Sequence, residues 1–330
     1  MRAQQIVELT GPDTALRLVD VPEPEPSHPM TPGSGIVVDV HAAGVSFPEV
    51  LQTRGEYQIK PELPFVPGSE VGGVVRSAPA DAPVKAGDRV AALCSLGGFA
   101  EVAVAPSFLT FAIPDAFSFA QGASLILNYH TAWFSLVMRG RLREGETVLV
   151  HGAAGGVGTA SIQVAKGVGA RTIAVVSSDD KERIAREAGA DEVVRSDGPW
   201  KDEARELTGG NGVDVVCDPV GGDRFTDSLR SLATGGRVVV VGFTGGSIPE
   251  VRVNRLLLNN VEVVGAGWGA YVMRHRETNT EIGAELDKLI EAGTVNPIVG
   301  ASFTLENASD ALKLIDGRGA TGKVVLSVRE

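Results

Sequence analysis

The sequence contains few residues of the kinds that bind metals or form disulfide bonds. It has two cysteines, Cys94 and Cys217, and five histidines among 330 residues. The histidines show no spacing typical of metal ligands. They are His28, His41, His130, His151 and His275. Cys217 lies in an apolar, strand-like run and is most simply a buried thiol, while pairing with Cys94 stays open. We therefore expect no metal site in this chain.

The sequence also lacks a hydrophobic run that is long and apolar enough to cross a bilayer. Residues 1–13 contain no apolar core of a signal peptide. The formal net charge of −11 and the pI of about 5.1 argue against nucleic acid or an anionic membrane as the main partner. The hydrophobic content of 43% suits one large or two medium domains. We expect a cytoplasmic protein with no nucleic-acid or membrane partner.

The stretch from Glu146 to Lys181 has the order strand, glycine-rich turn, helix and strand. An apolar run that ends at His151 precedes the sequence GAAGGVG at residues 152–158. Apolar residues at helical spacing follow, and then a second apolar run. This order predicts the first half of a dinucleotide-binding βαβ unit, although Ala153 replaces the usual first glycine. The cofactor diphosphate would be bound by backbone N–H groups at the helix N-terminus. The turn residues that we expect to contact the cofactor are Ala154, Gly155, Gly156, Val157 and Gly158.

The end of the second strand of this unit indicates which dinucleotide is bound. An acidic residue there accepts hydrogen bonds from the ribose of NAD and repels a 2′-phosphate. The strand ends instead in Ser177 and Ser178, and Lys181 follows closely. Asp179 and Asp180 come slightly late and fit the first turn of the next helix. The two serines and the lysine favour NADPH, and the alternative is an ordinary helix start with a solvated lysine.

The chain changes in character near residue 120. Before this point, short strand-like runs are separated by Gly and Pro, which is typical of a compact all-β unit. After it, strands alternate with helices, which predicts a parallel sheet covered on both faces. The tail from about residue 281 predicts helix, strand, helix and strand.

Several motifs together resemble those of the medium-chain dehydrogenase/reductase superfamily, and within it the zinc-independent NADPH:quinone oxidoreductases related to zeta-crystallin. The resemblance covers essentially the whole chain. The motifs are Ala42–Ser46, Gly55–Tyr57, Leu63–Glu70, Ala86–Val90, His151–Gly158, Ala188–Asp191 and Gly322–Lys323. The fold that this resemblance implies is α/β, with a Rossmann doubly wound parallel sheet inserted in a GroES-like β-rich catalytic domain. The implied Rossmann domain is 123–265, and the GroES-like domain is 1–122 and 266–330, with the active site between them.

The resemblance also marks two positions where zinc-dependent relatives carry metal ligands. Ser46 stands where those relatives have a cysteine, and Ser69 stands where they have the histidine of Gly-His-Glu. Serine is a poor zinc ligand, and the four-cysteine structural lobe of those relatives is absent. Alcohol dehydrogenation is therefore not expected. Hydride transfer from NADPH to a small apolar electrophile, a quinone or conjugated enone, needs little activation.

Two residues are predicted to donate hydrogen bonds to the oxygen of the acceptor that gains charge. Tyr57 falls at a family position that lines the active site, although a surface-loop tyrosine is the alternative. Ser46 falls where quinone reductases often carry Asn, so that a donor is kept with a shorter reach. His41 is a further candidate for a proton relay, although a histidine in a strand is more often simply packed.

The resemblance implies further cofactor contacts along the Rossmann part. Asn128 and Thr131 are expected near the nicotinamide. Arg195, after the third strand, is expected near the adenosine phosphate, unless it is solvated. The segment that follows the fifth strand is expected to pass under the cofactor. This segment is Gly242, Phe243 and Thr244.

Two more residues are assigned to the cofactor by the resemblance alone. Trp268 follows the sixth strand and would either close over the nicotinamide or pack at the domain junction. Lys323 resembles a family position near the cofactor.

Two other functions stay open. An enoyl-thioester reductase would need a cationic groove for the phosphates of CoA or of a carrier. The candidate residues are Arg252, Arg255, Arg274 and Arg276. A non-catalytic NADPH-binding protein, structural or regulatory, is the second alternative. Relatives often dimerise by joining their Rossmann sheets at the last strand, and Val261–Val264 is apolar enough for this, so we expect a homodimer.

Overall fold

The structure is a computed structural model that describes residues 1–329, and it divides into two compact units. The first unit contains residues 1–127 and the C-terminal residues from 297 onward, and the second contains residues 128–296. The predicted boundaries, near 122 and 265, differ from this division. Residues 266–296 belong to the second unit, because the two helices that they contain pack with that unit.

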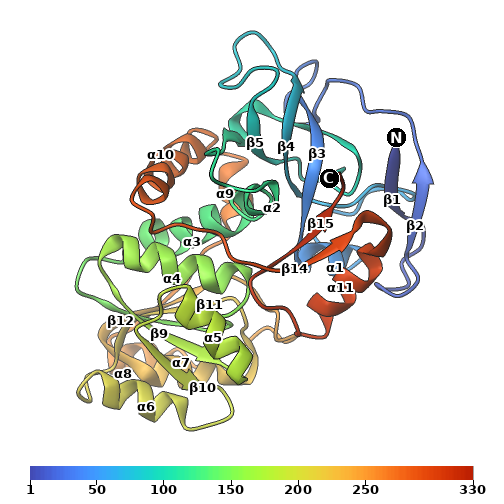
Figure 1. The fold of residues 1–330 in the computed structure, drawn as a ribbon. Helices are drawn as coiled ribbons and strands as arrows, with labels where there is room; N and C mark the ends of the chain where they lie inside the picture. Colours follow the sequence, from blue (N-terminus) through green and yellow to red (C-terminus); the bar gives the residue numbers. More distant parts are fainter. Residues whose placement is uncertain (330) are drawn as a thin grey trace. The chain divides into compact units, whose positions relative to one another are not determined.

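The first unit is built mainly from antiparallel strands (Figure 1). A seven-stranded sheet has the order β14-β15-β3-β4-β5-β7, with β6 paired to β3, and a separate ribbon joins β1 and β2. Only the β14–β15 pair of the described ladders in this unit is parallel. The strands are β1 (Arg2–Ile6), β2 (Leu16–Asp20), β3 (Ile36–Val45), β4 (Glu70–Ser77), β5 (Arg89–Leu93), β6 (Val102–Ala105), β7 (Thr110–Ala112), β14 (Val299–Thr304) and β15 (Lys323–Ser327).

Short helices cover this sheet and bury small aliphatic side chains against it. The core cluster joins residues of β3, β4 and β5 to residues of the C-terminal helix, so the two ends of the chain share one core. The helices of this unit are α1 (Phe47–Gln52), α2 (Phe119–Gly122) and α11 (Ala308–Asp316), with one-turn 3₁₀ segments at Ser107–Leu109 and Leu305–Asn307.

The second unit contains a six-stranded, fully parallel sheet in the order β10-β9-β8-β11-β12-β13 (Figure 1). The parallel sheet is the one that the alternation of strands and helices predicts, and its order is the doubly wound one that the resemblance implies, so the predicted α/β fold class is confirmed. The central strands are rich in valine and isoleucine and are buried, as strands covered on both faces must be. The strands are β8 (Thr147–Val150), β9 (Arg171–Val176), β10 (Glu192–Arg195), β11 (Val213–Asp218), β12 (Leu232–Val240) and β13 (Glu262–Gly265).

In the chain, one short helix precedes the strands of the second unit and the other helices follow them. The helices are α3 (Thr131–Trp133), α4 (Gly156–Val168), α5 (Asp179–Glu187), α6 (Trp200–Leu207), α7 (Phe225–Ser231), α8 (Asn254–Asn259), α9 (Trp268–Val272) and α10 (Glu277–Glu291). A 3₁₀ turn spans Gly222–Arg224, and two wider π-helical segments span Ile126–His130 and Phe134–Arg139. Single π-helical turns within helices occur frequently at functional sites.

Both cysteines are buried thiols in different units. Cys94 is 2% exposed and Cys217 is fully buried. Burial raises the pKa of each thiol to about 12.

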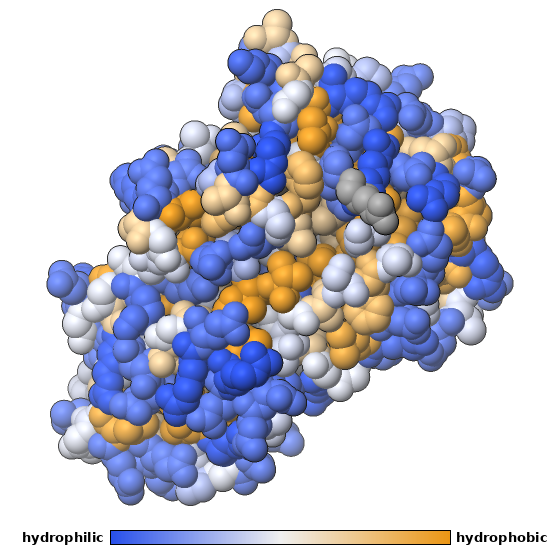
Figure 2. Space-filling view, viewed as in Figure 1, coloured by the Kyte–Doolittle hydropathy of each residue, from blue (hydrophilic) through white to orange (hydrophobic). Residues whose placement is uncertain are grey.

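Figure 2 shows a largely hydrophilic face with separate apolar patches. No helix within the described residues is both long enough and apolar enough to span a bilayer.

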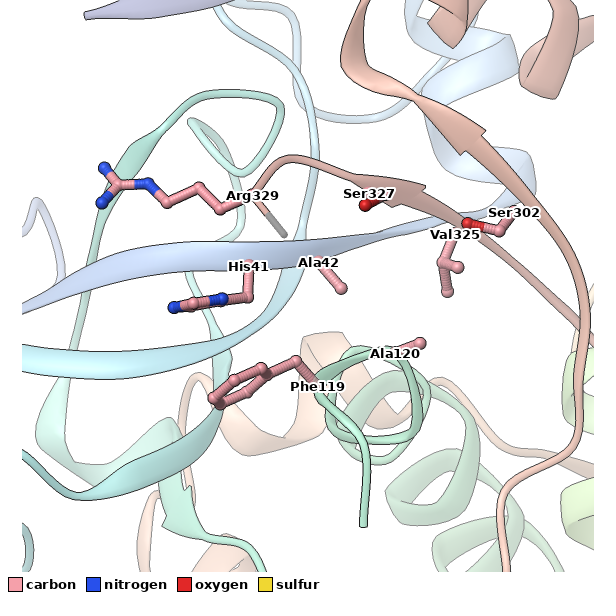
Figure 3. A pocket seen from close by; sticks show the side chains of 8 residues that line it. All are labelled: His41, Ala42, Phe119, Ala120, Ser302, Val325, Ser327 and Arg329. Atoms are coloured by element: carbon pink, nitrogen blue, oxygen red, sulfur yellow. The ribbon is translucent and has the colours of Figure 1, made fainter.

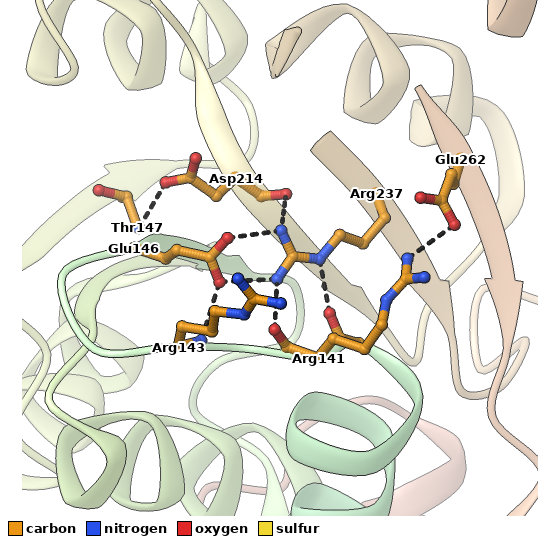
Figure 4. A network of polar contacts seen from close by, with 8 residues as sticks. Arg141, Arg143, Glu146, Thr147, Asp214, Arg237 and Glu262 are labelled. Atoms are coloured by element: carbon orange, nitrogen blue, oxygen red, sulfur yellow. Dashed lines mark hydrogen bonds and ion pairs between the residues drawn. The ribbon is translucent and has the colours of Figure 1, made fainter. Parts of the chain in front are cut away.

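A bidentate ion pair fixes the segment that leads into the parallel sheet (Figure 4). Arg237 on β12 donates from its two terminal nitrogens to the two carboxylate oxygens of Glu146, at 2.7 and 2.6 Å. The same guanidinium also donates to the carbonyl of Arg141 at 3.0 Å, and its side chain is only 8% exposed. Burial alone would raise the pKa of Glu146, but the bonds from Arg237 outweigh it and hold that pKa below its usual value. The pair therefore joins the start of β8 to β12.

We expect Arg237→Met to lower the free energy of unfolding by about 3 kcal/mol, because it leaves the Glu146 carboxylate without its partner in a mostly buried place. Urea denaturation of the purified chain measures this. Arg141→Met is the matched control. Its ion pair with Glu262 is also 2.7 Å long but is about half exposed, so we expect less than about 1 kcal/mol. Equal losses in the two variants would contradict a special role for Arg237.

Candidate functional site

The parallel sheet reverses its direction of growth between β8 and β11. From β8 the chain adds β9 and β10 on one side, and it then returns to add β11, β12 and β13 on the other. Open α/β sheets bind ligands outside the carboxyl ends of the strands at such a switch point. A ligand site is therefore expected at the loops after β8, β9, β11 and β12.

The loop after β8 leaves the N-terminus of a long helix uncapped. The backbone of His151 bonds to Cys217 of β11 at 3.0 Å, and Gly152 then turns the chain with φ +58°. Helix α4 begins at Gly156, and its N-cap, Gly155, supplies no side-chain hydrogen bond. The first N–H groups of a helix need acceptors, and the helix dipole favours negative charge there. This end of α4 is therefore suited to bind a phosphate group.

Two glycines of this turn have close neighbours. A Cβ atom at Gly158 would lie 2.2 Å from the carbonyl oxygen of Gly152, so only glycine lets α4 pack this closely on the turn. A Cβ atom at Gly156 would lie 2.6 Å from the side-chain nitrogen of Asn128. Asn128 is 5% exposed, and the structure thus brings two of the predicted cofactor residues into contact. Ala154 is buried, whereas Val157 is half-buried at the start of the helix.

The end of β9 brings three predicted residues together. The ammonium of Lys181 donates to the hydroxyl of Ser177 at 3.2 Å, and the hydroxyl of Ser178 caps helix α5 by accepting from the N–H of Lys181 at 3.3 Å. Ser177 is exposed and Lys181 is half-buried. One hydroxyl and one ammonium group therefore lie side by side where the carboxyl end of β9 leads into α5.

Arg195 is bound to acidic side chains of α5. Its guanidinium lies 3.1 Å from Asp179 and 3.8 Å from Glu182. The side chain of Asp179 is 99% exposed, so this pair is weak. The sequence did not indicate this competition for Arg195.

The loops after β11 and β12 are tied to each other. The backbone of Gly242 bonds to the carbonyl of Asp218, and the backbone and hydroxyl of Thr244 both bond to the carbonyl of Pro219, at 3.1 Å each. Phe243 between them is 38% exposed. Gly242, Phe243 and Thr244 thus lie at the carboxyl edge of the sheet.

Asp218 is a residue that the sequence analysis missed. Its side chain is 1% exposed, and one carboxylate oxygen accepts the backbone N–H groups of Val220 and Gly221 at 2.9 and 2.8 Å. Burial raises the pKa of this carboxyl group. An acidic residue at the end of an apolar strand was the available signal. Its role here is to fix the turn after β11.

Trp268 is packed inside the second unit. It is 4% exposed, and its ring centroid lies 5.6 Å from that of His130. This burial favours the packed-aromatic alternative over a side chain that closes on a ligand. Thr131 is half-buried at the start of α3, directly after the π-helical segment that carries Asn128.

A second polar cluster lies in the first unit, at one end of the neighbouring strands β15, β3 and β4. The ammonium of Lys323 donates to the hydroxyl of Ser46 at 2.8 Å and to the carboxylate of Glu70 at 3.0 Å. The side chains of Lys323 and Glu70 are 3% and 0% exposed. Ser46 is half-buried. The structure thus joins Ser46, a predicted catalytic residue, to Lys323, which was predicted to lie near the cofactor.

Glu49 holds the other side of this cluster. Its carboxylate accepts from the backbone N–H of Ser46 at 2.9 Å, and from the hydroxyl and the backbone N–H of Ser69 at 2.6 and 3.0 Å. Burial raises the pKa of Glu49, and also that of Tyr57, which additionally senses the charge of Glu49. Tyr57 is half-buried, and its phenol therefore stays protonated and able to donate.

His41 lies apart from this cluster, in a cavity of about 270 Å³ (Figure 3). Its ring stacks on Phe119, with centroids 4.3 Å apart and planes 24° apart. Burial, and then the charge of Arg329, lower the pKa of His41. His41 is thus packed against Phe119, as in the alternative weighed against a proton relay.

The four arginines of the thioester alternative lie on two different segments. Arg252 precedes α8 and Arg255 lies within it, whereas Arg274 and Arg276 lie between α9 and α10. Three of them are exposed and Arg255 is half-buried. Within residues 1–329, no three His, Cys, Asp or Glu side chains are arranged so that they could hold a metal ion.

Two family models match the chain. The model described as "Alcohol dehydrogenase GroES-like domain" matches residues 32–115, and the model described as "Zinc-binding dehydrogenase" matches residues 156–286. Each match falls on one of the two compact units. The chain is also 42% identical, over 88% of its length and 84% of the relative's, to "Quinone oxidoreductase-like protein 2" of Rattus norvegicus.

Two longer matches extend over nearly the whole chain. A protein named "Quinone oxidoreductase" from Rattus norvegicus is 33% identical over 99% of this chain and 97% of its own length. A mycobacterial protein, solved in complex with NADPH, is 35% identical with a TM-score of 0.90 and covers 99% of this chain and 100% of its own. Each of these two matches therefore includes both compact units of this chain, in the same order along the sequence.

Two buried histidines make the stability of the second unit depend on pH. His151 bonds through Nε2 to the hydroxyl of Ser228 at 2.8 Å and packs edge-on against Trp200, and His130 is 2% exposed. Burial lowers the pKa of each imidazole to about 3. In the unfolded chain the same two side chains have a pKa of about 6.5, so between about pH 6.5 and pH 3 the unfolded state binds more protons than the folded state. The two buried rings therefore do not lower the free energy of unfolding above about pH 6.5, and they lower it progressively as the pH falls from there towards 3.

We expect the side-chain NMR signals of His130 and His151 to keep the shifts of neutral imidazole from about pH 8 down to about pH 5. The same signals in urea should titrate near pH 6.5, as exposed histidines do. A titration midpoint near 6.5 in the folded protein would contradict the burial of these rings.

Proposed function

Because the chain belongs to the quinone oxidoreductase family of the medium-chain dehydrogenase/reductase superfamily, we propose that it is a zinc-independent oxidoreductase that passes reducing equivalents from NADPH to a quinone or conjugated enone. The observation that carries this proposal is the uncapped N-terminus of α4 at the switch point of the sheet, with Ser177 and Lys181 at the end of the next strand. A dinucleotide with a 2′-phosphate has anionic groups for both places.

The residues of the second unit fit this cofactor. The N–H groups at the start of α4 would hold the diphosphate, and Gly156 and Gly158 would let it approach the backbone. Lys181 and Ser177 would bind the 2′-phosphate. Asn128 would lie at the other end of the same turn, beside Gly156. NADPH supplies a hydride when it is bound, and the chain supplies position and charge.

The first unit would supply hydrogen-bond donors to the acceptor. Ser46 and Tyr57 are half-buried hydroxyl groups, and both are able to donate to an oxygen that gains negative charge. Zinc-independence rests on residue types, because Ser46 and Ser69 offer hydroxyl groups where a zinc site needs thiolate or imidazole. Ser69 already donates to Glu49, and Ser46 accepts from Lys323.

The proposal is tested by NADPH oxidation in metal-stripped protein with a panel of quinones. We expect quinone-dependent oxidation, and faster oxidation of NADPH than of NADH. Turnover of crotonyl-CoA in preference to every quinone would instead support an enoyl-thioester reductase. Binding of NADPH with no acceptor reduced would support a non-catalytic NADPH-binding protein.

Lys181→Ala should raise the KM for NADPH by about tenfold or more and leave that for NADH unchanged, because a hydrogen bond to a charged group contributes about 1.5–3 kcal/mol. Steady-state kinetics with both cofactors measures the change. Arg183→Ala is the matched control. It removes an equally positive side chain that is exposed and lies near Glu187, so no preference should be lost. A similar loss in both variants would indicate a general effect of charge.

A homodimer formed through β13 is part of this proposal. β13 is the edge of the six-stranded sheet and pairs with β12, and an unpaired edge is a template for a second copy. Large apolar side chains are exposed just before it. They are Ile248, Val253, Leu257 and Leu258, each more than 70% exposed.

The cytoplasmic location expected from the sequence remains a prediction.

We expect light scattering at micromolar concentration to give twice the chain mass of 34.3 kDa. The double variant Leu257→Glu/Leu258→Glu should give the monomer mass, because charge on these side chains opposes burial. Leu9→Glu is the control, since Leu9 is 50% exposed but lies in the other unit. A monomeric parent chain would remove the basis for this interface.

A further inference from the structure

Three neighbouring strands bring a positive charge, a negative charge and a hydroxyl group together. The register pairs Gly44 of β3 with Glu70 of β4, and Val45 of β3 with Val324 of β15. Ser46 follows β3 directly, and Lys323 precedes Val324. The order β15-β3-β4 thus places Lys323, Ser46 and Glu70 at one end of the sheet, although up to 277 residues separate them in sequence.

The polar contacts of this cluster form a chain that links Glu70, Lys323 and Ser46. The N–H of Leu127 donates to Glu70 at 2.9 Å, which fixes the carboxylate. Glu70 fixes the ammonium of Lys323 at 3.0 Å, and this ammonium donates to the hydroxyl oxygen of Ser46 at 2.8 Å. Lys323 and Glu70 are buried, whereas Ser46 is half-buried. Ser46 is therefore the one partly exposed residue among these three.

The chemistry of an ammonium group fixes the role of this hydroxyl. An ammonium only donates hydrogen bonds, so the hydrogen of Ser46 cannot point to Lys323. The backbone N–H of Ser46 is already bound by Glu49, which holds the residue at the start of α1. A hydroxyl that accepts from a cation also becomes a stronger donor, because hydrogen bonds in a chain polarise one another.

We propose that Lys323 and Glu70 form a positioning pair that turns the Ser46 hydroxyl outward and strengthens it as a hydrogen-bond donor to the carbonyl oxygen of the acceptor. This inference rests on the proposed function. Ser46 is the residue that contacts the acceptor. Lys323 and Glu70 do not contact the acceptor and affect it only through Ser46. The hydroxyl donates a hydrogen bond as the acceptor oxygen gains charge, and no proton is transferred.

The first test uses variants that leave no unpaired charge in the buried cluster. Ser46→Ala removes the donor, and Lys323→Met/Glu70→Gln removes both charges together, because either single change would leave a buried charge alone. The triple variant combines them. The matched control is Arg237→Met/Glu146→Gln, which neutralises another mostly buried ion pair, in the second unit.

The variants are assayed with quinones of graded reduction potential at saturating NADPH. Ser46→Ala and Lys323→Met/Glu70→Gln should each lower kcat for the weakest acceptor by about a hundredfold, the low side of the contribution of one such donor. Strong acceptors need the donor less and should lose less. The triple variant should lose no more than Ser46→Ala, since the pair acts through Ser46. The control should show one common factor for all acceptors. Equal losses across acceptors, or additive losses in the triple variant, would overturn the proposal.

A second readout does not depend on turnover. Infrared difference spectra of a quinone bound to the cofactor-free protein report the carbonyl stretch, which a hydrogen-bond donor shifts to lower frequency. We expect this shift in the parent chain and in the control, and its loss in Ser46→Ala and in Lys323→Met/Glu70→Gln. An unshifted band in the parent chain would overturn the proposal even if NADPH oxidation occurs. A shifted band without NADPH oxidation would support the hydrogen bond from Ser46 to the quinone and would contradict the proposed function instead.

Discussion

A buried positive charge must be neutralised where it lies, and this requirement determines how the first unit is built. Lys323 lies near the end of the chain, and its ammonium needs a carboxylate that is also buried. Glu70 meets this need only when β15 and β4 both flank β3 in the observed register. The ion pair is thus consistent with one arrangement of these three strands.

The two units provide positive potential in different ways within an acidic chain. In the second unit, it comes from the N–H groups of an uncapped helix and from Lys181 at the surface. In the first unit, the ammonium of Lys323 is buried and paired with Glu70, and it polarises the hydroxyl of Ser46 to which it donates. Neither device requires a basic surface, so the net charge of −11 is compatible with an anionic cofactor.

Much of the second unit could be predicted from the sequence because its signals are local. Strands such as Arg171–Val176 are short valine-rich runs, and the turn at 152–158 follows one of them directly. The cluster of Ser177, Ser178 and Lys181 lies within five residues, so its contacts follow from helix capping.

The contacts that the sequence did not reveal join distant segments. Nothing local to Lys323 indicates that its partners are Glu70 and Ser46, because this depends on the order of strands in the sheet. The ion pair of Arg195 with Asp179 similarly depends on the distance between β10 and α5. Trp268 had two possible environments, and burial of its ring depends on packing against the distant His130.

The placement of the two thiols has a consequence for an enzyme that handles electrophiles. Quinones and enones add to thiolates, and a thiol reacts in proportion to its exposure and its ionised fraction. Cys94 and Cys217 are buried, and neither ionises near neutral pH, since their pKa values lie at about 12. The folded chain therefore offers its own substrates no thiol to alkylate. Loss of the fold would expose both, so resistance to chemical damage by its acceptors is a property of the native packing.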